Sequence, residues 1–179
     1  MKIKVNKILL EVALMFQAKQ DVRYYLNGIC FMPGGRIAST DGHRAFIAEG
    51  GEHKLKDNVI VKVSKSPTKR YEYAIIDTKT KIVTYHDESD VMVGAGICEE
   101  VDGRFPDIGR VVPKKTEPTD RIGFNAQYLA DIAKAVKVFN PKYQSISLEL
   151  QGKTDSAVVK AISPLGFKAT FVVMPMRID

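Results

Sequence analysis

The residues most able to do chemistry are three histidines and a serine–aspartate pair, and their spacing supports neither catalysis nor metal binding. His43, His53 and His86 lack metal-ligand spacing to one another and to the cysteines. Ser39, Asp41 and His43 lie together, but they alternate along one expected hairpin, whereas a catalytic triad draws its members from separate elements. The stronger interpretation is a tight turn whose side chains cap the backbone. With no phosphate-binding glycine loop of either common type, we expect no enzyme, metal or cofactor.

The composition is that of a globular protein that could meet an anionic partner. The 179 residues carry a formal net charge of +6 and a pI near 9.2, which favours nucleic acid as a partner. Cys30 and Cys98 lie in apolar, strand-like runs, so we expect them to be reduced and buried. No apolar run approaches the ~20 residues of a membrane helix. Glu11 interrupts the apolar start and no cleavage site follows, so we expect a strand, a helix and a cytoplasmic protein.

Residues 1–50 are predicted to form a β-α-β-β-β unit. Lys2 to Val5 alternate as a half-buried strand does, and Asn6 is suited to cap a helix over residues 7–18. The helix has apolar residues at helical spacing. Three strands are expected after it, at 24–32, 36–40 and 44–48, with Pro33-Gly34-Gly35 and Asp41-Gly42 as the turns.

Residues 121–179 are predicted to repeat this order. A short strand at 121–124 precedes Asn125, which caps a helix over 126–139. Three strands are expected after it, at 145–150, 157–162 and 167–174. The recurrence predicts a duplicated unit with approximate two-fold symmetry.

The middle of the chain differs from both ends because it has no helical period. Residues 51–100 hold four strand-like runs, at 59–63, 71–76, 81–86 and 91–98. Residues 101–120 are rich in proline, glycine and charge, so we expect a linker or crossing segment. The predicted fold class is therefore α+β, with two β-α-β-β-β halves, a helix-less middle and, together, one domain.

The last eleven residues, ATFVVMPMRID, have two interpretations. A strand enters at Ala169, and Pro175 ends its pairing because proline has no N–H to donate. The stretch could simply be an edge strand that completes a core. Alternatively, Met174 and Met176 could belong to a surface that grips partner peptides, where methionine is over-used.

Four stretches of the chain resemble the bacterial sliding clamp, the beta subunit of DNA polymerase III. They occur in family order and are KQDVRYYLNGICF (19–31), ASTDGHRAFIAE (38–49), VDGRFPDIGRVVPK (101–114), and IGFNAQYLADIAKAVK (122–137) together with FVVMPMR (171–177). The resemblance implies a ring built from domains, each a pair of β-α-β-β-β halves, with helices lining the hole. This chain has about half the family's length, so it looks like a shortened clamp, of the kind a phage or mobile element could encode.

The resemblance also implies a groove that accepts short apolar motifs from polymerases and other client proteins. An apolar trough would take the apolar side chains of a motif, while Arg44, Arg177 and backbone groups would fix its polar ends. Ala45 and Gly109 depart from the family pattern, which would make the trough wider and the linker looser. The matching residues are Leu26, Thr40, Gly42, His43, Arg44, Pro106, Arg110, Val111, Val172, Val173, Met174, Pro175, Met176 and Arg177.

A second implied site would contact duplex DNA without reading its sequence. Arg23 could meet a phosphate, and Gln20 and the tyrosines could bond backbone oxygens. Such contact should weaken as salt rises. A solvated helix end is the alternative interpretation for these residues. The matching residues are Lys19, Gln20, Arg23, Tyr24, Tyr25, Lys134 and Lys137.

Three hypotheses on function follow from these observations. The first is a processivity factor that self-associates into a ring, encircles duplex DNA and tethers a polymerase or other replication protein. The second is a monomeric clamp mimic that keeps the groove and sequesters or redirects the replication proteins of a host. The third, an unrelated enzyme, is disfavoured by the missing motifs.

Overall fold

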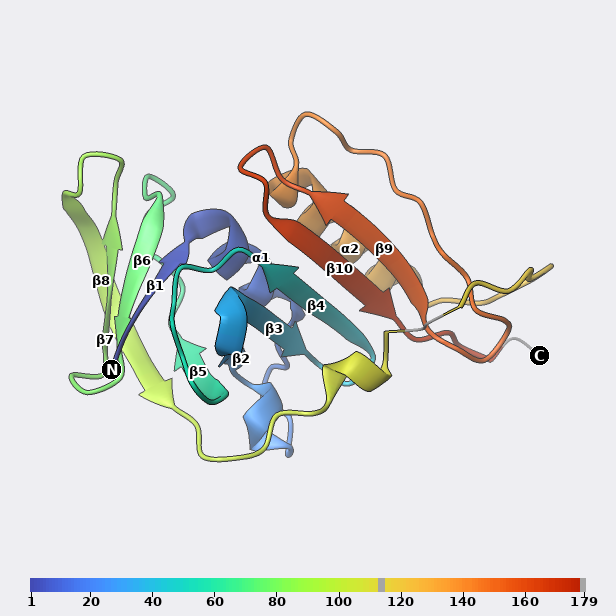
Figure 1. Cartoon of the computed structure of the whole chain (residues 1–179), viewed down its shortest axis with the longest axis horizontal. Helices are drawn as coiled ribbons and strands as arrows, with labels where there is room; N and C mark the ends of the chain where they lie inside the picture. Colours follow the sequence, from blue (N-terminus) through green and yellow to red (C-terminus); the bar gives the residue numbers. More distant parts are fainter. Residues whose placement is uncertain (113–114, 178–179) are drawn as a thin grey trace.

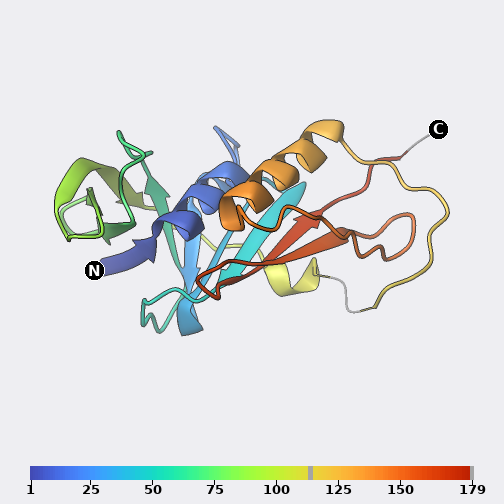
Figure 2. The same ribbon diagram turned by 90° about the horizontal axis from the view of Figure 1, so that it is seen from above.

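The computed structural model describes residues 1–112 and 115–177, and it consists of antiparallel strands with the α-helices on one face (Figures 1 and 2). Residues 113–114 of the predicted linker, and the last two residues of the chain, lie outside the described residues. In the part that is described, neither helix has both the length and the apolarity needed to cross a membrane.

The first region forms the predicted β-α-β-β-β order: β1 (Lys2–Asn6), α1 (Lys7–Phe16), β2 (Ile29–Met32), β3 (Arg36–Thr40) and β4 (Arg44–Glu49). Asn6 caps α1, because its Oδ1 accepts from the Ile8 N–H at 2.9 Å. The prediction that the helix reaches residue 18 is wrong. The Ala18 N–H bonds the Leu26 carbonyl at 2.9 Å instead, so the chain leaves the helix after Phe16.

The predicted strand over 24–32 is wrong in its first half. Tyr24–Leu26 form a 3₁₀ turn, η1, and β2 begins only at Ile29. The reason is a reciprocal bond across the loop. The Asp21 N–H donates to Asn27 Oδ1, and Asn27 Nδ2 donates to the Asp21 carbonyl, both at 2.9 Å. The pair closes residues 21–27 into a compact loop that has no strand partner.

The middle region contains the four predicted strands, β5 (Val59–Val63), β6 (Tyr73–Asp77), β7 (Ile82–His86) and β8 (Met92–Glu100). Strand β1 pairs antiparallel with β6 over its full length, so the middle strands are joined to the first region rather than added beside it. Strand β8 pairs with β7 from Met92 to Ile97 and with β5 from Cys98 to Glu100. A single strand thereby links the two sheets.

The last region contains α2 (Ala126–Phe139), β9 (Ala157–Ile162) and β10 (Lys168–Val173). Asn125 caps the helix as predicted, with Oδ1 accepting from the Gln127 N–H at 2.9 Å. The strands predicted at 121–124 and 145–150 are wrong, because each stretch makes only one bridge, Gly123 with Met176 and Glu149 with Val158. The described residues of this region therefore form α-β-β and not the full β-α-β-β-β order.

The strands run in the order β1-β6-β7-β8-β5-β2-β3-β4-β10-β9, so the first and last regions meet where β4 pairs with β10. Figure 2 shows α1 and α2 on one face of β2 to β4 and the 3₁₀ turn η3 (Ile108–Arg110) on the other. The main core lies under the helices, and its aromatic centre is formed by Phe16, Phe46, Phe139 and Phe171.

A second apolar cluster lies on the opposite face. Phe105 and Ile108, from the predicted linker, pack there against Cys30 and Met32. Both cysteines are free and buried, as predicted, and burial raises the pKa of the Cys30 thiol to about 12. This thiol is consequently protonated at neutral pH.

Candidate functional site

The turn between β3 and β4 is capped by the side chains of Thr40 and Asp41. Asp41 Oδ1 accepts from the backbone N–H groups of His43 and Arg44, at 2.9 and 3.0 Å. Thr40 Oγ1 donates to the Arg44 carbonyl at 2.7 Å and accepts from the Gly42 N–H at 3.0 Å. Gly42 has a φ of 91°, which glycine adopts without strain. The prediction of a tight turn with backbone-capping side chains is confirmed.

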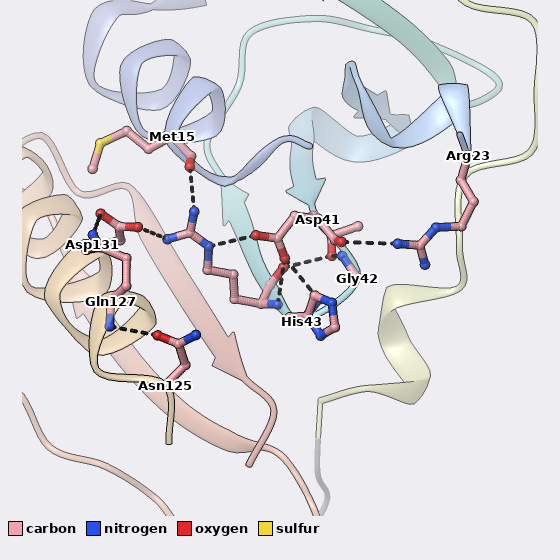
Figure 3. Close-up of polar contacts among 10 residues, drawn as sticks. Met15, Arg23, Asp41, Gly42, His43, Asn125, Gln127 and Asp131 are labelled. Atoms are coloured by element: carbon pink, nitrogen blue, oxygen red, sulfur yellow. Dashed lines mark hydrogen bonds and ion pairs between the residues drawn. The ribbon is translucent and has the colours of Figure 1, made fainter. Parts of the chain in front are cut away.

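Arg44 sends its guanidinium from this turn toward the helices (Figure 3). Its Nε donates to Asp41 Oδ2 at 2.9 Å, its Nη1 lies against Asp131 Oδ2, and its Nη2 donates to the Met15 carbonyl at 3.3 Å. The guanidinium also lies 5.1 Å from the Phe16 ring centre, and the side chain is 11% exposed. Its charge is therefore already partnered within the fold, which is not the peptide-facing orientation that the sequence analysis expected.

A second contact ties the same turn to α2. The His43 ring stacks on the Tyr128 ring with centroids 5.9 Å apart, and the Arg44 guanidinium lies 5.2 Å from that ring. Asp131, one turn further along α2, completes the connection through Arg44. Two side chains of α2, Tyr128 and Asp131, thus hold the turn.

The turn, β10 and the η3 segment enclose a small hollow of 40 Å³. The Met174 N–H donates to the His43 carbonyl at 2.8 Å, which joins the end of β10 to the turn. Ala45 and Val172 are buried in one apolar cluster beneath it. The lining residues are Thr40, Gly42, His43, Arg44, Ala45, Val111, Val172 and Met174, and all except Ala45 are residues that the sequence assigns to the groove.

A larger, more polar hollow of 640 Å³ adjoins the first, and the two share Val111 and Met174. Arg110 lies here, with its Nε donating to Asp107 Oδ2 at 3.1 Å. Ser156 Oγ donates to the Val111 carbonyl at 2.6 Å and so fixes one wall. Sequence reasoning missed three polar residues of this lining, Gln151, Asp155 and Ser156. No local sequence signal marks them, and only the fold brings them to the hollow.

The other six predicted groove residues do not line these two hollows within the described part of the chain. Leu26 and Val173 are buried in the fold. Met176 is exposed, and its N–H donates to the Gly123 carbonyl at 2.8 Å. Pro106 and Arg177 are also exposed, and Pro175 is half-buried.

The predicted DNA residues fall into two groups. Lys19, Gln20, Arg23, Tyr24 and Tyr25 belong to the loop between α1 and β2, and all except the half-buried Tyr25 are exposed. Lys134 and Lys137 are exposed on α2. Lys19 and Lys134 line a common hollow between the helices, whose lining does not include Lys137.

Arg23 is also engaged within the fold. Its Nη2 lies 2.8 Å from Asp21 Oδ2 and donates to the Asp41 carbonyl at 3.3 Å, beside Gly42 (Figure 3). The side-chain hydrogen bond from Arg23 lowers the pKa of Asp21 to about 2. The expected DNA loop and the expected groove turn are therefore in direct contact.

Comparison with known proteins defines the class of protein. No family model matches the chain. The beta sliding clamps of Vibrio cholerae and Escherichia coli K12 are each 30% identical to it, over 156 and 158 residues, which is 79% of this chain. The chain spans 40% of the length of these curated relatives.

Solved structures of DNA polymerase III beta clamps have the same fold. The Caulobacter crescentus protein superposes with a TM-score of 0.68 at 18% identity, covering 99% of this chain and 66% of that one. The Pseudomonas aeruginosa subunit gives 0.65 at 19% identity, covering 98% and 66%. The Bartonella birtlesii clamp, solved bound to griselimycin, gives 0.65 at 17% identity, covering 99% and 66%.

The fold is therefore that of a DNA clamp. The chain is related to the bacterial beta sliding clamps, as the resemblance of its four stretches predicted. The predicted α+β clamp-like fold class is confirmed. The two-fold symmetry of its halves and the division of the chain into four segments stay predictions.

Proposed function

We propose that the chain is a sliding-clamp-like accessory protein of DNA replication, without enzymatic activity. It binds short apolar motifs of a polymerase or other replication proteins, and it contacts duplex DNA without sequence preference. Such a protein would act in the cytoplasm. The observation that carries the proposal is the hollow at the β3–β4 turn, where seven predicted groove residues from three separate parts of the chain meet.

The hollow is small for this task, so binding needs a movement. Its 40 Å³ is well below the ~150 Å³ of a cavity that takes benzene. Met174 forms part of the wall, is 38% exposed, and has a flexible side chain that can adopt several rotamers. We expect Met174 to swing aside when an apolar side chain enters. The two adjoining hollows would then join at Val111 and Met174 into one groove.

Arg44 has a positioning role in this proposal. Its guanidinium is held by Asp41 and Asp131, so it orients the turn and does not bind the peptide. Polar ends of a motif would meet Arg110 and the backbone instead, because Arg110 is 85% exposed at the larger hollow.

Fluorescence anisotropy with a labelled client motif from a bacterial polymerase tests the groove. Val111→Ala and His43→Ala should each weaken binding about tenfold, equivalent to about 1.4 kcal/mol, because both side chains line the hollow. Leu165→Ala is the matched control, because Leu165 is 61% exposed in the turn between β9 and β10. Absence of binding by the unaltered protein would reject the groove.

Sedimentation and retention on circular duplex DNA test the clamp itself. A chain of this length would need several copies to close a ring. Self-association together with retention on the circle supports a processivity factor. A monomer at high concentration that still binds the motif would instead support the clamp mimic.

A further inference from the structure

A basic hollow of 440 Å³ lies between α1, α2 and the loop that joins β5 to β6. We call it the lysine hollow, defined by the four lysines in its lining, Lys19, Lys65, Lys69 and Lys134. The loop supplies two of them, Lys65 and Lys69, which are exposed and belong to neither site predicted from the sequence. No helix occupies this part of the middle region, so the loop lies directly against α1.

The loop is fixed at its β8 side. The Ser64 N–H donates to the Ile97 carbonyl, and the Ile97 N–H donates to Ser64 Oγ, both at 3.0 Å. Pro67 packs so closely on Gly94 that a Cβ on that glycine would lie 2.8 Å from Pro67 Cγ. Any side chain at position 94 of β8 would clash with Pro67 and displace the loop.

The loop is fixed at its α1 side by Lys7. Its Nζ donates to the Lys69 carbonyl at 2.6 Å and lies 5.3 Å from the Tyr71 ring centre. Thr68 Oγ1 accepts from the Arg70 N–H at 3.1 Å, which adds a local turn. Lys65 and Lys69 therefore belong to a loop that hydrogen bonds hold to α1 and to β8, and such preorganisation lowers the entropic cost of binding.

In the part of the chain that the structure describes, neither carboxylate in the lining forms a salt bridge with one of the four lysines. The lining has two carboxylates, Glu11 and Asp131. Asp131 is already paired with Arg44, which also belongs to the lining. Within the described residues, none of the four lysines takes part in a salt bridge. A cluster of unpaired ammonium groups around a concave surface attracts a polyanion.

We propose that the lysine hollow binds phosphates of the duplex DNA backbone, with Lys65 and Lys69 as contacts and Lys7 as their positioning residue. The proposal rests on the proposed function and names a part of its DNA-binding surface. Ammonium groups meet phosphates as point charges and read no bases. Tyr71, the aromatic residue of the lining, is 1% exposed, so the hollow offers no platform on which single-stranded bases could stack.

The test measures duplex affinity over a series of salt concentrations. In Lys65→Gln/Lys69→Gln, the slope of log K against log salt should fall by about 1.8, since each phosphate contact contributes about 0.9. Affinity at low salt should fall at least tenfold. Lys79→Gln/Lys81→Gln is the control, because it removes the same charge from exposed lysines at the opposite end of β6. The control should keep the slope of the unaltered protein.

The outcomes separate this proposal from the one on which it rests. If the Lys65/Lys69 variant keeps the original slope while the unaltered protein binds duplex, the lysine hollow is not a phosphate site and the other DNA contacts stand. If the unaltered protein does not bind duplex at low salt, this proposal and the duplex contact in the proposed function are both overturned, whereas the motif groove is decided by its own test. If the Lys65/Lys69 variant loses the binding of inorganic phosphate but binds duplex with the slope and affinity of the unaltered protein, the hollow is a small-anion site, and the duplex assignment is wrong.

Discussion

Among the described residues, α1 and α2 are each capped by an asparagine side chain, but the fraction of buried residues differs greatly between them. In α1, six of ten residues are buried, because the helix is enclosed by the sheet, the β5–β6 loop and α2. In α2, four of fourteen residues are buried. The region that contains α1 is also the more complete of the two. The first region completes its β-α-β-β-β order, whereas the last keeps two strands, β9 and β10.

The difference shows that the last region depends on the first for its core. Phe139 of α2 and Phe171 of β10 pack against Phe46 of β4, with ring centroids 6.2 and 5.5 Å away. Phe171 also meets Phe16 of α1 at 5.4 Å. The last region thus places its largest apolar side chains in a core that the first region provides. We expect the regions to unfold together.

Phe171→Ala should give the largest effect and tests that dependence. It removes a fully buried ring at the junction and should lower the free energy of unfolding by about 3–5 kcal/mol. Urea unfolding followed by circular dichroism and by tyrosine fluorescence should show a single transition in both probes. Leu148→Ala, in the exposed stretch that was wrongly predicted as a strand, should change stability by about 0.5 kcal/mol or less. Two separate transitions in the unaltered protein would contradict the shared core.

Arg44→Met should have the next largest effect, because Arg44 is the polar connection between the regions. The variant leaves Asp41 and Asp131 without their cation and should cost about 2–4 kcal/mol of unfolding free energy. Thermal and urea unfolding measure it. Adding Asp131→Asn should recover part of the loss, since the uncompensated charge is then removed. If Arg44→Met were as stable as the unaltered protein, the ion pairs of Arg44 would contribute nothing to stability.

Local sequence signals were sufficient for much of the fold. The helix at 126–139 and the strands at 59–63 and 157–162 were predicted with their observed bounds, because periodicity and the cap Asn125 mark them within the chain itself. The strand at 145–150 was predicted from the same kind of alternation and is absent. Alternation permits a strand, but a strand forms only where a neighbour offers a ladder, and here only Glu149 finds one.

The candidate site likewise has features that the local sequence predicts and features that it does not. The capped turn at Asp41-Gly42 could be predicted, because aspartate and glycine define such turns locally. The pairing of Arg44 with Asp131 could not be predicted, since Asp131 lies 87 residues further along the chain. The four lysines of the lysine hollow likewise come from three segments that only the fold brings together. What sequence reasoning missed are contacts between distant segments.

The smallest predicted effect lies in the loop between α1 and β2, where Arg23 bonds Asp21. The pKa of Asp21 is about 2 in the folded protein, below its ordinary value of 3.8, so the bond's contribution to stability is present above about pH 4 and is lost as pH falls through about 2. Carboxyl-carbon NMR should give a midpoint near 2. Arg23→Gln should raise that midpoint toward the ordinary value, whereas Arg104→Gln, at an exposed position in the segment before η3, should not.

The titration of Asp21 also reports on the contact between the α1–β2 loop and the β3–β4 turn. Asp21 Oδ1 accepts from the Arg23 N–H at 2.8 Å, and Arg23 reaches the Asp41 carbonyl of the groove turn. Protonating Asp21 should therefore speed amide exchange at Arg23, and the change should extend to the β3–β4 turn. It should leave α2 unaffected, because α2 holds that turn through Asp131 and Tyr128 and not through Arg23. An equal response in α2 would show that the two regions are more tightly coupled than their contacts indicate.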